Sequence, residues 1–133
     1  MNRIAIDTNI YSAFKRNDPG VTRVLRKVEY IGVSVVVLGE LMGGFKCGSK
    51  AEKNMTELSQ FLDTPRVFVL TTDQETAEFY SEIYQDLRKR GNPVPSNDIW
   101  IAASAMRNGL ALFSLDEHFK KISGIIRKNL SEE

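Results

Sequence analysis

The hydrophobic positions of this chain fall into short runs and longer periodic stretches. Short aliphatic runs predict buried strands at residues 3–6, 33–37, 67–70 and 110–114, with a weaker one at 124–127. Apolar periodicity together with cap and stop signals predicts helices at 20–29, 38–45, 74–90 and 98–108. Strands that alternate with helices predict an α/β fold of βαβ units, with a mostly parallel sheet covered on both faces.

Two of these helices carry distinct burial patterns. In the segment 74–90 one face holds apolar residues at helical spacing, so that face is predicted to pack on the core: Ala77, Tyr80, Ile83, Tyr84 and Leu87. The segment 98–108 is apolar nearly all round, which predicts a buried helix with Trp100 packed in the core.

The composition fits one globular domain over residues 1–133, because 133 residues, 42% of them hydrophobic, are enough to build a core without staples. The single Cys47 excludes an intramolecular disulfide, and one histidine leaves no set of zinc ligands. The 18 basic and 17 acidic residues give a net charge of +1, so a nucleic-acid partner would have to meet a local basic patch.

No segment has the pattern of a membrane or export signal. Asp7 interrupts the stretch where a signal peptide would be apolar, and no later apolar run approaches the roughly 20 residues of a membrane span. We therefore expect a cytoplasmic protein with no membrane partner.

Four acidic residues are placed where an α/β sheet carries its functional crevice. Asp7 follows the first strand directly, Glu40 follows the second, Asp116 comes two residues after the fourth, and Asp98 opens the buried helix. Since the carboxyl ends of parallel strands share one edge, we expect these carboxyl groups to converge there.

Two interpretations of these acids are open. Asp7, Asp98 and Asp116 are all suited to helix N-caps, and Glu40 to the first turn of a helix, where it would complement the dipole. Alternatively, a divalent cation neutralises the four carboxylates together, because hard cations such as Mg²⁺ or Mn²⁺ select oxygen ligands. The cation explains all four positions at once and is favoured here.

The residue inventory also limits the chemistry. With His118 as its one histidine, the chain cannot use two imidazoles as acid and base to cleave RNA. Water activated by one or two metal ions needs no histidine and hydrolyses phosphodiester bonds. The predicted activity is therefore metal-dependent phosphodiester hydrolysis.

Four sequence motifs resemble the PIN domain, and specifically the VapC-type toxins of bacterial toxin–antitoxin pairs. They are Ile6-Asp7-Thr8-Asn9, Glu40, Asn97-Asp98-Ile99-Trp100-Ile101-Ala102-Ala103 and Ser114-Leu115-Asp116-Glu117-His118-Phe119. They occur in the family's order and span nearly the whole chain.

The resemblance implies a PIN-like fold with a five-stranded, mostly parallel sheet and helices on both faces. It further implies an endoribonuclease that depends on Mg²⁺ or Mn²⁺, acts as a toxin on an RNA substrate, forms a homodimer and is inhibited by a cognate antitoxin. By the same resemblance, Asp7, Glu40, Asp98 and Asp116 are the catalytic and metal-binding acids. The polar residues that support them are Thr8, Asn9 and Ser114.

Several cations are candidates for contact with RNA phosphates, although each also fits an ordinary solvated helix surface: Lys15, Arg16, Lys46, Arg88 and Arg90. Tyr11 is a candidate for base stacking or antitoxin contact. His118 and Cys47 are interpreted as incidental.

Alternatives from other functional classes remain open. A phospho-receiver domain shares the parallel sheet and would use Asp73 after the third strand, but its paired acids after the first strand are missing. A PIN-like domain outside a toxin–antitoxin pair would bind nucleic acid without cutting it, or cleave structured DNA by the same chemistry.

Overall fold

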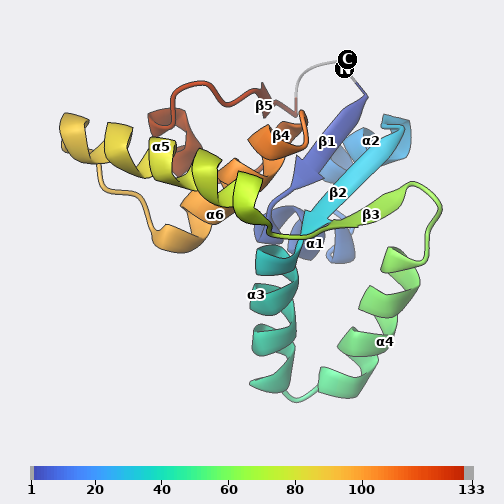
Figure 1. Cartoon of the computed structure of the whole chain (residues 1–133). Helices are drawn as coiled ribbons and strands as arrows, with labels where there is room; N and C mark the ends of the chain where they lie inside the picture. Colours follow the sequence, from blue (N-terminus) through green and yellow to red (C-terminus); the bar gives the residue numbers. More distant parts are fainter. Residues whose placement is uncertain (1, 131–133) are drawn as a thin grey trace.

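Five parallel strands form the sheet at the centre of the molecule (Figure 1), in the order β3-β2-β1-β4-β5. The structure is a computed structural model that describes residues 2–130, so the ends of the predicted domain, residues 1 and 131–133, lie outside the described residues. The strands are β1 (Arg3–Ile6), β2 (Tyr30–Ser34), β3 (Val67–Leu70), β4 (Ala111–Phe113) and β5 (Arg127–Lys128). The predicted α/β fold with a parallel sheet is confirmed.

Helices cover both faces of this sheet. They are α1 (Thr8–Lys15), α2 (Pro19–Lys27), α3 (Val35–Lys46), α4 (Ala51–Leu62), α5 (Gln74–Arg90), α6 (Ser96–Arg107) and a short 3₁₀-helix η1 (Glu117–Lys121). Figure 1 shows α2 and α5 on opposite sides of the strands, and α3 and α4 as a hairpin that projects from the sheet. Within residues 2–130, no helix has the length and apolar character needed to cross a membrane.

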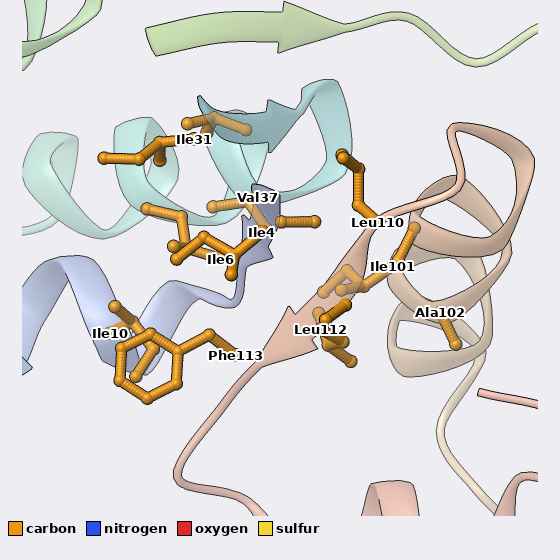
Figure 2. Close-up of a cluster of buried hydrophobic side chains, with 14 of the residues drawn as sticks. Ile4, Ile6, Ile10, Ile31, Val37, Ile101, Ala102, Leu110, Leu112 and Phe113 are labelled. Carbon is orange, nitrogen blue, oxygen red and sulfur yellow. The ribbon is translucent and has the colours of Figure 1, made fainter. Parts of the chain in front are cut away.

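The core is built around β1 and β4. Successive residues of a strand point to opposite faces, so Phe113 packs toward Ile10 of α1 while Leu112 packs toward Ile101 of α6 (Figure 2). All four of these side chains are at most 2% exposed. The two central strands are thus held from both sides by apolar contacts.

The register of β1 and β4 sets up the edge where the acids lie. Ile6 pairs with Phe113, and the Asp7 amide donates to the Phe113 carbonyl at 3.0 Å. The residues that follow the two strands, Asp7 and Ser114, are therefore neighbours across the end of the sheet.

The second strand was predicted at residues 33–37, and this range is wrong because the strand ends at Ser34. Ser34 caps α3 by accepting a hydrogen bond at 3.2 Å from the Val37 amide, so the valines from Val35 onward are helical. A continuous apolar run fits a buried strand and a buried helix equally well, and here the cap decides between them.

Other elements also depart from the pattern. The sequence pattern does not predict α1 or α4, and α4 has no side-chain cap to mark its start. β3 was predicted as buried, but it is an edge strand with Phe68 and Val69 exposed by 44% and 45%. On α5, Ile83 and Leu87 are buried as predicted, whereas Ala77 and Tyr84 are exposed.

Gly32 in β2 provides a test of the packing between the strands. A Cβ there would lie 2.7 Å from Leu70 Cδ1 and 2.9 Å from Leu110 Cδ1, so Gly32→Val should lower the free energy of unfolding by about 1–3 kcal/mol. The control Gly39→Ala, in open space on α3, should raise it by about 0.5–1 kcal/mol. Urea denaturation measures both; equal stability of the Gly32→Val protein and the parent would contradict this packing.

Candidate metal centre

Asp7 lies at the floor of the site, between β1 and α1. It is 6% exposed and caps α1, where its Oδ1 accepts a hydrogen bond at 2.7 Å from the Thr8 amide. Its Oδ2 accepts a second one at 2.7 Å from the Ser114 hydroxyl. The carboxylate is therefore fixed in one orientation by two donors.

Ser114 connects the ends of β1 and β4. Besides donating to Asp7, its hydroxyl oxygen accepts from the Asp116 amide at 3.0 Å and from Asn9 Nδ2 at 3.4 Å. Asn9 Oδ1 in turn accepts from the Leu115 amide at 3.2 Å. The supporting positions proposed for Asn9 and Ser114 are thus places where these side chains tie two loops together.

Glu40 enters the site from the middle of α3, and not from a strand end as expected. Its carboxylate accepts a short hydrogen bond from Thr8 Oγ1 and another at 3.0 Å from Asn97 Nδ2. The interpretation that Glu40 complements the dipole in a first turn is wrong, because α3 begins at Val35 and has no acid in its first turn.

Asp98 lies in the first turn of α6, three residues after Pro95, which occupies the N-cap position without a side-chain hydrogen bond. The N-cap interpretation of Asp98 is therefore wrong. For Asp116 it is correct, since this residue caps η1 and its Oδ1 accepts from the His118 amide at 2.9 Å.

The four carboxyl groups line one open cleft. The cleft has a volume of about 480 Å³ and is also lined by polar side chains of α1, so its lining residues are Asp7, Thr8, Asn9, Ser12, Arg16, Glu40, Asp98 and Asp116. Among residues 2–130, no lysine or arginine forms an ion pair with any of the four acids.

The electrostatics of the cleft show that the acids oppose one another. Burial raises the pKa of the Asp7 carboxyl, and the negative charges of Asp98 and Glu40 raise it further, against the opposing hydrogen bonds from Ser114 and Thr8. Burial also raises the pKa of Asp98, with added contributions from Asp116 and Glu40. Contact with His118 opposes this rise. A donor set of carboxylate oxygens without lysine or arginine partners fits a bound divalent cation.

The candidate RNA-contacting cations separate into distinct environments. Arg16 lines the acidic cleft, whereas the adjacent Lys15 forms an ion pair at 3.3 Å with Glu57 of α4. Arg90 is paired with Asp86 at 2.7 Å, and Arg88 donates to the Tyr84 hydroxyl at 3.1 Å beside another cleft at the end of α5. Lys46 is exposed at the far end of α3.

Two residues of the site were not predicted from the sequence. Asn97 holds Glu40, and the imidazole Nδ1 of His118 lies 3.2 Å from Asp116 Oδ1 and 3.5 Å from Asp98 Oδ2. Both could have been found from the sequence, because each lies within two residues of a predicted acid along the chain. His118, interpreted from the sequence as incidental, thus lies against two of the predicted acids, whereas Cys47 is a free, exposed thiol outside the cleft.

The structure does not support the predicted stacking role of Tyr11. Tyr11 is only 3% exposed and its ring packs edge-on against Phe61 at 5.2 Å, so it presents no free face to a base. Trp100 stacks on Tyr80 with ring centroids 4.1 Å apart, but it is only partly buried and lies outside the hydrophobic core, so its prediction as a core residue is wrong.

A comparison with protein families identifies the fold. The sequence model of the PIN domain matches residues 4–125, which is most of the chain. The chain belongs to the PIN domain family. The resemblance inferred from the four motifs is therefore confirmed. The phospho-receiver alternative is wrong, and the Asp73 it would use caps α5 through a reciprocal hydrogen-bond pair with Thr76.

This PIN domain is similar in sequence to VapC proteins. The chain is 36% identical over 88 residues to Ribonuclease VapC4 of Mycobacterium tuberculosis, which covers 66% of this chain and 68% of the relative. It is 30% identical over 129 residues to Ribonuclease VapC2 of Rickettsia felis, covering 93% and 95%. A solved structure of VapBC2 from Rickettsia felis, bound to a promoter DNA fragment, superposes with a TM-score of 0.87 at 26% identity, covering 96% of this chain and 98% of the other.

The raised pKa of Asp7 gives a prediction about stability. The folded state binds this proton more tightly than the unfolded state, so the carboxylate lowers the stability of the metal-free protein increasingly as pH rises above the ordinary value of about 3.9. Asp7→Asn keeps the cap without the charge and should raise the Tm in EDTA at pH 7, with the gain shrinking toward pH 4.

The matched control is Asp63→Asn, which changes an exposed acid outside the cleft and should not alter the Tm in this way. Thermal denaturation between pH 4 and pH 7 measures both variants. A lower Tm of Asp7→Asn at pH 7 in EDTA would show that the negative charge of the buried carboxylate does not destabilise the metal-free protein.

Proposed function

We propose that this protein is a metal-dependent endoribonuclease and the toxin of a type II toxin–antitoxin pair. The observation that carries the proposal is the convergence of four carboxyl groups on one open cleft without lysine or arginine partners. Its VapC relatives are named ribonucleases, which supports RNA as the substrate.

In this proposal Asp7 and Asp98 hold Mg²⁺ or Mn²⁺, and Glu40 and Asp116 contribute directly or through water. The cation, when bound, lowers the pKa of water and stabilises negative charge on the phosphate and the leaving oxygen. The reaction adds water across a P–O bond, so the new P–OH forms as the bond to the leaving oxygen breaks and that oxygen takes up a proton.

The residues around the acids orient them for this task. Thr8 and Asn97 hold the two oxygens of Glu40, and Ser114 holds one oxygen of Asp7. Because the carboxylates of Asp7 and Glu40 keep fixed polar partners, their remaining oxygen lone pairs point to defined positions in the cleft. These contacts support the assignment of Thr8, Asn9 and Ser114 as supporting residues.

Arg16 is the cation placed to bind the substrate. It follows α1 as its C-cap residue and lies at the rim of the acidic cleft with Thr8 and Ser12, and among residues 2–130 it has no ion-pair partner. A guanidinium at this rim fits the charge and fork geometry of an RNA phosphate.

The partners are part of the proposal. The similar structure from Rickettsia felis is a VapBC2 complex, which supports a cognate antitoxin that inhibits this protein. A homodimer is supported by apolar side chains left exposed on the edge strand β3, namely Phe68 and Val69. A single domain and a cytoplasmic location stay predictions.

Cleavage of total cellular RNA by the purified protein tests the proposed activity. Cleavage should require Mg²⁺ or Mn²⁺, stop in EDTA and fall by at least about 100-fold in Asp98→Asn, since several kcal/mol of transition-state stabilisation are lost. Asp63→Asn should cleave like the parent.

Persistent cleavage in EDTA, or by Asp98→Asn, would show that the acids do not form the active site. Cation binding without cleavage of RNA would favour a PIN-like domain that only binds nucleic acid. Cleavage of branched or flap DNA with intact RNA would favour a structure-specific nuclease.

Binding of a fluorescein-labelled single-stranded RNA tests the role of Arg16. In the inactive Asp98→Asn background, Arg16→Ala should weaken binding about tenfold and reduce the slope of log affinity against log salt by about 1. Lys15→Ala is the control, because Lys15 is engaged with Glu57, and its effect should be smaller. Equal losses in the two variants would refute a specific role for Arg16.

A further inference from the structure

His118 is the one histidine of the chain and lies beside the acidic cleft, on η1. Its Nδ1 is 3.2 Å from Asp116 Oδ1 and 3.5 Å from Asp98 Oδ2, and its side chain is 49% exposed. One ligand atom from each of these three residues lies within 4.8 Å of the others. A single ion could therefore contact all three side chains.

The possible metal ligands of the cleft fall into two groups. Asp7 and Glu40 are joined through Thr8, whose amide donates to Asp7 and whose hydroxyl donates to Glu40. Asp116 and His118 lie close to Asp98 on the η1 side of the cleft. The first group offers oxygen atoms alone, whereas the second adds the nitrogen of His118.

The imidazole is not needed to hold Asp116 in place. The backbone amide of His118 already donates to Asp116 Oδ1 at 2.9 Å, and the Asp116 amide donates to Ser114 Oγ at 3.0 Å. The loop is thus fixed by its backbone, so the half-exposed imidazole, which lies beside Asp98 and Asp116, is available to contact a ligand in the cleft.

We propose that His118 is a metal ligand, whose imidazole nitrogen joins Asp98 and Asp116 in binding a divalent cation on the η1 side of the cleft. Imidazole suits first-row transition ions, whereas Mg²⁺ favours oxygen donors alone. This position therefore prefers Mn²⁺ or Co²⁺ to Mg²⁺, in contrast to the oxygen-only side at Asp7 and Glu40. The inference rests on the proposed function in sharing the cation-binding acids.

Because the chain has one histidine, a direct spectroscopic test is unambiguous. Untagged full-length protein is loaded with Mn²⁺, and electron spin-echo modulation is recorded with natural-abundance and with ¹⁵N-labelled histidine. We expect imidazole ¹⁴N modulation that is replaced by the ¹⁵N pattern on labelling and is lost in His118→Ala. Bound Mn²⁺ without histidine modulation would overturn the inference.

Affinities provide the second measurement. His118→Ala should weaken Mn²⁺ and Co²⁺ binding at least about tenfold and Mg²⁺ binding by a smaller factor. The control Glu117→Gln changes the neighbouring residue, which pairs with Lys120 and Arg127, and should leave the Mn²⁺ affinity and the nitrogen signal unchanged. Equal weakening of Mg²⁺ and Mn²⁺ in His118→Ala would contradict a nitrogen-ligand role.

The outcomes separate this inference from the proposed function. Mn²⁺ binding that requires Asp98 but shows no histidine nitrogen leaves the metal-dependent nuclease standing and removes His118 from the ligands. No Mn²⁺ binding at all overturns both. A Tm of His118→Ala in EDTA equal to that of the parent verifies that the variant is folded, as expected for a half-exposed side chain.

Discussion

The pairing of β1 with β4 is the constraint on which the site depends. This register places Asp7 beside Ser114 at the end of the sheet, with the Asp7 amide bonded to the Phe113 carbonyl. Apolar side chains of α1 and α6 pack on the two faces of these strands and exclude water from the carboxylate. The buried charge is tolerated because two hydrogen-bond donors, at fixed positions, face it.

Two of the other acids, Glu40 and Asp98, reach this point from helices rather than from strand ends. Glu40 comes from the middle of α3 and Asp98 from the first turn of α6, so the packing of these two helices sets how near the carboxylates lie. The apolar residues of α6 stabilise an arrangement that the acids themselves oppose. This is a common compromise at functional sites, where local stability is lowered in exchange for binding.

The rim of the cleft differs from its floor in the sign of its charge. The floor carries carboxylates, of which Asp7 and Glu40 are held by neutral donors, whereas Arg16 contributes a cation from the end of α1. Because Arg16 and the carboxylates are not paired with each other, the carboxylates remain available to bind a cation and Arg16 remains available to bind a phosphate. The η1 side adds an imidazole, which makes the donor set unequal across the cleft.

The sequence by itself determined the α/β class, the parallel sheet and three of the strand and helix ends that carry acids. Asp7 and Asp116 follow strands and Asp98 lies in the first turn of a helix, and the local hydrophobic pattern predicts positions of this kind. Tertiary structure alone decided the rest. The apolar run through Val35 fits either a strand or a helix, so only the Ser34 cap decided that α3 starts at Val35 and carries Glu40 in its middle rather than in its first turn. Lys15 and Arg16 are adjacent cations, and only the position of Glu57 on α4 directs one away and leaves the other at the cleft. These outcomes depend on contacts between segments distant in sequence, which local periodicity does not encode.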